Sequence, residues 1–280
     1  MKKLNLLSFA LMGTMALSFY GCQKKDAATT TAASSQDKIS AATKSQINKM
    51  GFSTENARKV KGGYLVEGDI LLTDKNLNEK AVSSHLSIAE TEQYRTTNLV
   101  NALPRVITVS VTNLPQVYSD ATDAMITRYN NLGLRVTFQR AAPGNTGDID
   151  IFGFDEGVGP DGYITLGSSG FPTSGGDPFN QIQMNTNVDA YGANPDQGYL
   201  TSVIQHEVGH CIGFRHTDYA NRAYSCGGSY ANEGQSDVGA IRIPGTPSGP
   251  NAASFMLACS NGSDRTFNAN DKIALNYLYK

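Results

Sequence analysis

Histidine is scarce in this chain, because only 4 of its 280 residues are histidine. Net charge is also small, since 23 lysines and arginines nearly balance 25 aspartates and glutamates and leave a formal charge of -2. A near-neutral chain lacks the basic surface that binds phosphate backbones, so we expect no nucleic-acid partner. The few histidines are unevenly placed, and three of them lie between His206 and His216.

Those three histidines follow the pattern HExxHxxGxxH. On a helix, His206 and His210 project from the same face one turn apart, where both can bind a single ion. Glycine tolerates positive φ, so Gly213 can end the helix and turn the chain until His216 approaches from outside it. Isolated histidines are usually surface or satisfied core residues, but five fixed positions together indicate a metal site.

The pattern favours catalytic zinc over structural zinc. Three neutral imidazoles leave a fourth coordination position open, whereas structural zinc sites are closed by four protein ligands. Glu207 directly follows His206 and points beside the metal, where its carboxylate can take a proton from zinc-bound water. We therefore predict one Zn2+ held by His206, His210 and His216, with Glu207 as the general base.

At this motif the sequence resembles the metzincin metallopeptidases, in which a methionine-containing turn lies beneath the zinc. Met256, in the segment 253–259, is the matching candidate. The string HEVGHCIGFRHTD looks most like the bacterial dual-action HEIGH-type metallopeptidases. The resemblance covers residues 101–280 and implies an α+β fold with a mixed twisted sheet, a zinc-binding active-site helix and a C-terminal helix.

Two positions depart from metzincin patterns. Thr217 stands where several metzincin families have a serine, glutamate or proline, and Ala258 stands where astacin-type enzymes have a tyrosine. The resemblance therefore does not extend to the auxiliary ligand and transition-state donor that this tyrosine supplies.

Hydrophobic periodicity predicts the elements of the catalytic domain. One helix is expected at 115–132, a second from near Tyr199 with Asp196 as its cap, and a third at 267–279 with Asn268 as its cap and Asp271 in its first turn. A strand is expected at 163–166, and the segment 163–167 occupies the place of the family's edge strand, which could hold an extended peptide by β-augmentation. Together with that segment, strands are expected at 106–111, 134–138, 149–154 and 181–184.

The N-terminus indicates export. Lys2 and Lys3 precede an apolar stretch, and residues 1–21 read as a signal peptide. The alternative is a membrane anchor, but a segment that crosses a bilayer needs about 20 apolar residues, and this stretch barely reaches that length. Cys22 after Gly21 resembles a bacterial lipobox, so we expect a lipidated Cys22 and membrane attachment by that lipid alone. Residues 22–40 read as a flexible tether. The expected location is the cell envelope or surface of a bacterium, or otherwise the secreted fraction.

Residues 41–100 are predicted to form a propeptide, because an exported protease has to be silent during export. A helix is expected at 39–50 and a single strand through residues 61–72. The string Val66-Glu67-Gly68-Asp69 resembles the inhibitory element of astacin-type propeptides, which implies that Asp69 could fill the open zinc position and make the chain a zymogen. The alternative is a surface turn with two ordinary acids. His85, outside the motif, is expected to be solvated.

Two further features leave alternatives open. With Cys22 lipidated, one disulfide is expected among the other three cysteines, and both Cys211–Cys226 and Cys226–Cys259 are reasonable. Acidic residues among glycines could bind Ca2+ or serve only as polar turn residues. These are Asp148, Asp150, Asp155, Glu156, Asp161 and Asp177.

The sequence thus predicts an exported, monomeric zinc endopeptidase that acts on protein or peptide substrates. Two alternatives belong to other classes: a non-catalytic surface binding or adhesion module on a metzincin scaffold, and a cell-wall-directed zinc amidase. Glu207 favours an enzyme, because a purely structural zinc site has no need of a base. Substrate preference depends on cleft shape and loop contacts, which one sequence does not determine.

Overall fold

A computed structural model describes residues 38–78, 93–159, 162–234 and 239–280. The predicted signal peptide, Cys22, His85 and Asp161 lie outside the described residues. Within the described ranges, no helix has the length and apolar character that a membrane crossing requires.

A five-stranded sheet forms the framework, in the order β6-β5-β7-β9-β8. Four strands are parallel, and only β8 at one edge runs antiparallel to its neighbour β9. The predicted mixed sheet is therefore confirmed. The strands are β5 (Arg105–Thr112), β6 (Val136–Arg140), β7 (Ile149–Phe154), β8 (Gly167–Ser168) and β9 (Gln181–Asn185).

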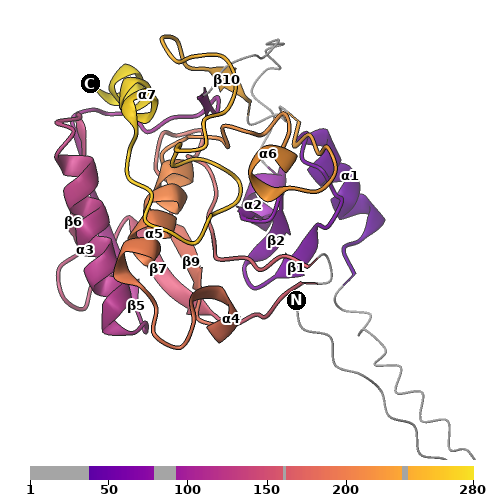
Figure 1. Cartoon of the computed structure of the whole chain (residues 1–280), viewed down its shortest axis with the longest axis horizontal. Helices are drawn as coiled ribbons and strands as arrows, with labels where there is room; N and C mark the ends of the chain where they lie inside the picture. The colour runs from indigo at the N-terminus through magenta and orange to yellow at the C-terminus, as the bar shows by residue number, and fades with distance from the viewer. Residues whose placement is uncertain (1–37, 79–92, 160–161, 235–238) are drawn as a thin grey trace, which may run out of the picture. The chain divides into compact units, whose positions relative to one another are not determined.

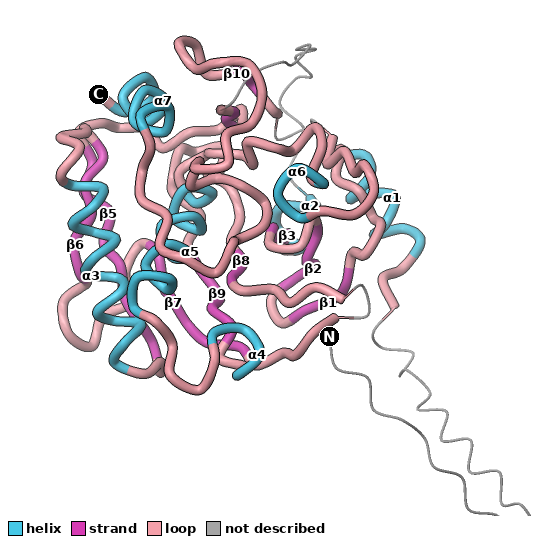
Figure 2. The backbone as a smooth tube through the Cα atoms, in the orientation of Figure 1, coloured by secondary structure: helices cyan, strands magenta, loops and turns pink. Residues whose placement is uncertain are grey.

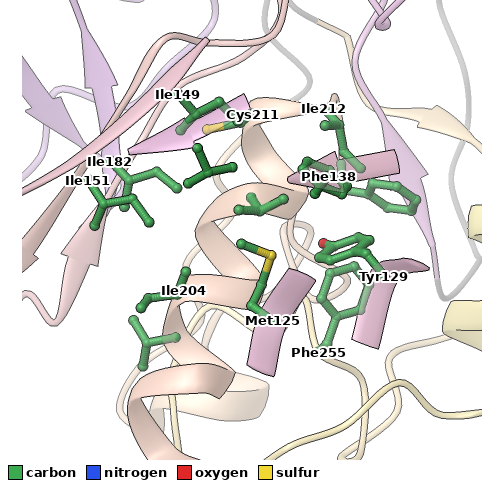
Figure 3. Close-up of a cluster of buried hydrophobic side chains, with 14 of the residues drawn as sticks. Met125, Tyr129, Phe138, Ile149, Ile151, Ile182, Ile204, Cys211, Ile212 and Phe255 are labelled. Carbon is green, nitrogen blue, oxygen red and sulfur yellow. The ribbon is translucent and has the colours of Figure 1, made fainter. Parts of the chain in front are cut away.

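Two long helices, α3 (Gln116–Asn130) and α5 (Gln197–Cys211), pack against each other and against this sheet (Figure 1). Figure 3 shows Ile149, Ile151 and Ile182 of the sheet near Ile204 and Cys211 of α5. Burial of such side chains drives folding by removing apolar surface from water. α5 is thus held from both sides, which gives the histidines on it a rigid support.

The segment before the sheet forms a smaller unit of secondary structure: α1 (Ala41–Lys49), β1 (Arg58–Val60), β2 (Gly63–Val66), β3 (Ile70–Leu72) and α2 (Asp74–Asn78). The prediction of one strand through residues 61–72 was wrong, because β2 and β3 pair antiparallel as a hairpin. Glu67 and Gly68 at its tip have φ values of 54° and 90°. This left-handed backbone reverses the chain between Val66 and Ile70.

The edge strand was predicted four residues too early. Tyr163 does not lie in a strand. It is 47% exposed, and its hydroxyl donates a hydrogen bond to the carbonyl of Cys226. The carbonyl of Leu166 accepts from the backbone of Asn185, and strand pairing begins only at Gly167. The edge next to α5 is therefore Gly167–Ser168.

After α5 the chain is mostly irregular, as Figure 2 shows. It contains α6 (Ala223–Cys226), β10 (Ile241–Arg242), which pairs with β4 (Tyr94–Arg95), and the C-terminal α7 (Ala269–Tyr279). A short α4 (Val188–Tyr191) precedes α5. A disulfide joins Cys226 to Cys259 and Cys211 is a buried free thiol, so the second of the two expected pairings is confirmed.

Candidate metal centre

Both ends of α5 are defined by the predicted residues. The Asp196 side chain accepts a hydrogen bond from the backbone of Tyr199 at 2.8 Å and caps the first turn. At the other end Gly213 has φ 107°, and the backbone N–H groups of Gly213 and Phe214 bond to the carbonyls of His210 and Gly209. This C-terminal turn needs a left-handed residue and reverses the chain, which brings His216 back toward the helix.

The three motif histidines converge through their Nε2 atoms. His210 Nε2 lies 3.0 Å from His206 Nε2 and 3.2 Å from His216 Nε2. Asp69 joins them from the hairpin tip, with Oδ2 at 3.1 Å from His216 Nε2 and 3.5 Å from His206 Nε2. All four residues are buried, and they form the one group of potential metal ligands found among the described residues.

These distances fit tetrahedral zinc. Donors about 2.0–2.1 Å from a zinc ion sit at the corners of a tetrahedron whose edges are about 3.3–3.4 Å long. The four distances between donor atoms are 3.0–3.5 Å. A nitrogen and oxygen donor set of this size is well matched to a zinc ion, and the buried cluster indicates a metal site.

The opposite ring nitrogens are bound by fixed acceptors. His206 Nδ1 is 2.8 Å from the carbonyl oxygen of Phe255, and His210 Nδ1 is 2.8 Å from that of Phe214. His216 Nδ1 is 3.0 Å from both carboxylate oxygens of Glu233. Since a carbonyl only accepts, Nδ1 of His206 and of His210 carries the proton and the Nε2 lone pair points inward.

Outer contacts of this kind orient metal-binding imidazoles and increase their basicity. Burial, reinforced by the neighbouring imidazoles of His206 and His216, lowers the pKa of His210 well below its ordinary value. His210 is therefore neutral at neutral pH, and the neutral imidazole is the form that binds metal.

Met256 lies directly beneath α5. A Cβ built on Gly209 would come within 2.5 Å of the Met256 sulfur, so helix and methionine touch where a larger residue has no space. The carbonyl of Met256 accepts from the backbone of Thr217 at 2.8 Å. Asp271 fixes the same segment from α7, because its carboxylate accepts from the backbone of Phe255 and from the hydroxyl of Ser254.

Glu207 is buried and held by a serine. The Ser169 hydroxyl lies 2.7 Å from Glu207 Oε2 and donates to it. The backbone of Ser169 pairs with the hairpin: its N–H bonds to the Asp69 carbonyl at 3.0 Å, and its carbonyl accepts from Leu71 at 2.7 Å. Burial, and then the nearby Asp69 carboxylate, raise the pKa of Glu207 well above the ordinary value. One edge residue thus contacts both an extended peptide segment and the Glu207 carboxylate.

Three residues of this site were missed in the sequence. Glu233 lies in a loop without any recognisable motif, so no local signal could have identified it. Ser169 depends on the correct position of the edge strand, which periodicity misplaced. Arg215, which is buried and lies 3.2 Å from the Glu67 carboxylate, could have been noticed, because a charged residue beside the buried metal motif needs a partner.

The acidic residues considered for calcium make other contacts. Asp148 accepts from Thr108, and Asp150 accepts from the hydroxyls of Ser110 and Thr112. Asp155 accepts from Asn187, while Glu156 and Asp177 pair with Arg58 and Arg105. These contacts give the calcium prediction no support, and it stays a prediction.

Comparisons with known proteins place the chain in a family. Two solved structures resemble it at low sequence identity. Myroilysin has 15% identity and a TM-score of 0.41, and the match covers 65% of this chain and 86% of that chain. The hatching enzyme zinc-protease HCE-1 from the medaka fish Oryzias latipes has 14% identity and a TM-score of 0.33, and the match covers 62% of this chain and 88% of that chain. A search of curated proteins found no match. The sequence model of the dual-action HEIGH metallo-peptidases matches residues 64–279 and begins inside the segment predicted as propeptide. The chain therefore belongs to the dual-action HEIGH metallo-peptidase family and is a zinc metallopeptidase.

Proposed function

We propose that this chain is an exported zinc endopeptidase that is made in a latent form. The observation that carries the proposal is the convergence of His206, His210 and His216 with Asp69, at distances that match the edges of a zinc tetrahedron. Three imidazoles supply the permanent ligands, and the carboxylate takes the position that a catalytic site keeps open. Met256 supports this site from below as the methionine turn.

Glu207 is the general base of the proposed reaction. A bound zinc ion would supply Lewis acidity toward the scissile carbonyl and acidify the attacking water. The Glu207 carboxylate accepts the proton of that water and returns it to the leaving amine. Ser169 holds the carboxylate through Oε2, and the backbone of Ser169 offers one N–H and one carbonyl to an extended peptide.

Asp69 accounts for the proposed latency. Its carboxylate competes with water for the fourth ligand position, and the hairpin backbone competes with substrate for the edge at Ser169. The hairpin has to move off this edge before a peptide can bind there. Cleavage within or after residues 41–100 would release it.

The proposed location is based on the sequence alone. Residues 1–21 direct export, and the thiol of Cys22 carries a lipid that tethers a monomer to the envelope or surface of a bacterium. Metabolic labelling with a fatty acid, compared with a Cys22→Ser variant, tests this: label on the variant equal to label on the parent contradicts lipid attachment at Cys22.

The proposed reaction is tested with protein expressed from residue 23 onward. We expect stoichiometric zinc, no release from cell-wall fragments, and cleavage of casein once the hairpin segment has been removed. Glu207→Gln should retain zinc and fold while turnover falls by about 10²–10⁴-fold, since it removes only the proton acceptor. His210→Ala should lose zinc and activity together.

Asp69→Ala separates latency from catalysis. This variant should cleave casein before any N-terminal processing, whereas the parent should do so only after its hairpin segment has been removed. Full activity of the purified Glu207→Gln variant would refute the role of the base. Equal activity of the unprocessed parent and unprocessed Asp69→Ala would refute the latent state.

A further inference from the structure

The hairpin tip inserts a second carboxylate beside Asp69. The Glu67 side chain is 1% exposed, and its Oε2 lies 3.2 Å from an Nη atom of Arg215. The other oxygen, Oε1, is buried and has no hydrogen-bond partner among the residues that the structure describes. The metal proposal leaves Glu67 without a role, although burying a carboxylate is costly unless it is paired.

Arg215 and Arg222 contact Glu67, and we call the site that they line around it the Glu67 pocket. Arg215 lies at its buried end. Its guanidinium donates to the carbonyls of Gly234 and Gly239, each at 3.3 Å. The rings of Phe171 and Tyr219 lie 5.7 and 5.8 Å from its central carbon. These four groups lie outside the hairpin and can hold the guanidinium after the hairpin leaves, whereas the Phe52 ring, 5.6 Å from the same carbon, belongs to the predicted propeptide.

Arg222 lies at the rim of the same pocket. Its guanidinium donates to the Glu67 carbonyl and lies 3.6 Å from Glu233. A Cβ built on Gly68 would come within 2.5 Å of this guanidinium, so the arginine packs directly over the hairpin tip. The side chain is 22% exposed, which makes Arg222 the accessible member of the pair.

We infer that the Glu67 pocket is a recognition site for an acidic side chain of the peptide substrate, and that Glu67 occupies it until the hairpin leaves. This inference rests on the proposed function. Glu67 and Asp69 are two residues apart, so an acidic side chain in the pocket would lie within about two residues of the scissile bond. Arginine is well suited to this task because its guanidinium presents a fixed fork of donors to a carboxylate.

The pocket can be tested without any catalytic activity. Glu67→Gly in the zinc-loaded full chain removes the side chain at a position whose φ of 54° suits glycine. Propionate has the same atoms as the lost side chain beyond Cα, so millimolar propionate should raise the melting temperature of this variant. The neutral isostere propionamide should not, and Glu67→Gln, which keeps the pocket filled, should not respond to propionate. Equal responses of the Gly and Gln variants would overturn the inference.

The second test measures substrate preference in the activated enzyme. Among peptides that differ only in Glu against Gln, or Asp against Asn, near the cleaved bond, kcat/KM should favour the acid by about tenfold or more. Arg215→Gln should reduce that ratio to near one, because Arg215 is the residue that pairs with the Glu67 carboxylate, and an unchanged zinc content checks that the variant is folded. Arg140→Gln is the matched control, because Arg140 lies on β6 at the opposite edge of the sheet and should leave the ratio unchanged.

The two tests distinguish the possible failures. An enzyme that cleaves acidic and neutral peptides equally, with a pocket that binds propionate, would show that Glu67 only anchors the hairpin, and the inference would be wrong. If the activated protein cleaves no peptide but its Glu67→Gly variant binds propionate, the proposed peptidase reaction is refuted. The Glu67 pocket would then bind carboxylates without selecting substrates. If propionate does not stabilise Glu67→Gly and the enzyme shows no preference for acidic peptides, the Glu67 pocket is not a carboxylate-binding site.

Discussion

Because Gly209 contacts Met256, we predict that replacing this helical glycine by alanine lowers the stability of the protein, where such a replacement usually raises it. Gly209 lies in the interior of α5 between two histidines, where alanine would normally stabilise a helix by about 1 kcal/mol. Here the added Cβ would meet the Met256 sulfur at 2.5 Å and the Phe255 ring at 2.9 Å. Overpacking of a full core costs about 1–3 kcal/mol. The overpacking cost exceeds the gain in helix propensity by up to about 2 kcal/mol, so Gly209→Ala should destabilise the protein by up to that amount.

Urea denaturation in a Glu207→Gln background measures this free energy without autolysis. Zinc binding should weaken as well, by about tenfold or more, because a displaced Phe255 carbonyl no longer orients His206. A Met256→Ala substitution opens space beneath the helix, so adding Gly209→Ala to that variant should cost less than adding it to the parent. A Gly209→Ala protein more stable than the parent would refute the close packing of Met256 against α5.

Two further predictions concern buried hydrogen bonds. Ser169→Ala should lower kcat by about tenfold and leave zinc content unchanged, because it removes one charge-assisted hydrogen bond from Glu207. Ser168→Ala is the matched control. An unchanged kcat for Ser169→Ala would contradict the role of Ser169 in positioning Glu207. Burial raises the pKa of Asp271 from 3.8 to about 6, so the folded state holds its proton more tightly than the unfolded state. This group's contribution to stability is greatest at low pH and declines as pH rises from about 4 to about 6, by up to about 3 kcal/mol. Asp271→Asn lacks this titration, so in urea denaturation the parent's free energy of unfolding minus that of the variant should fall from pH 4 to 7, and a difference that does not change with pH would contradict the raised pKa.

The sequence was sufficient to predict the structural features that depend on contacts between residues close together in the chain. Asp196 caps α5 and Asn268 caps α7 because each carboxylate or amide reaches a backbone N–H two or three residues ahead. Gly213 turns the chain for the same local reason. The helix–turn–histidine arrangement could thus be predicted from a short stretch of the chain.

Long-range contacts could not be predicted in this way. The Glu233 carboxylate meets His216 across an irregular loop, and nothing in the spacing of that loop specifies the contact. The β2–β3 hairpin was missed because its apolar residues continue on both sides of the turn, so the segment resembles one strand. Only the left-handed backbone at Glu67 and Gly68 separates the two strands, and Glu67 is not a residue that usually signals such a turn.

The hairpin tip brings three separate contacts into one short turn. Asp69 lies among the histidines, Glu67 lies on Arg215, and the backbone from Asp69 to Leu71 pairs with Ser169. Under the proposed function these are the three positions that a substrate needs: the reacting carbonyl, one side chain and an extended backbone. Loss of the Asp69 carboxylate alone would leave the other two contacts in place. The unprocessed Asp69→Ala chain should then have a raised KM for peptides, and removal of the whole hairpin should lower KM with little change in kcat.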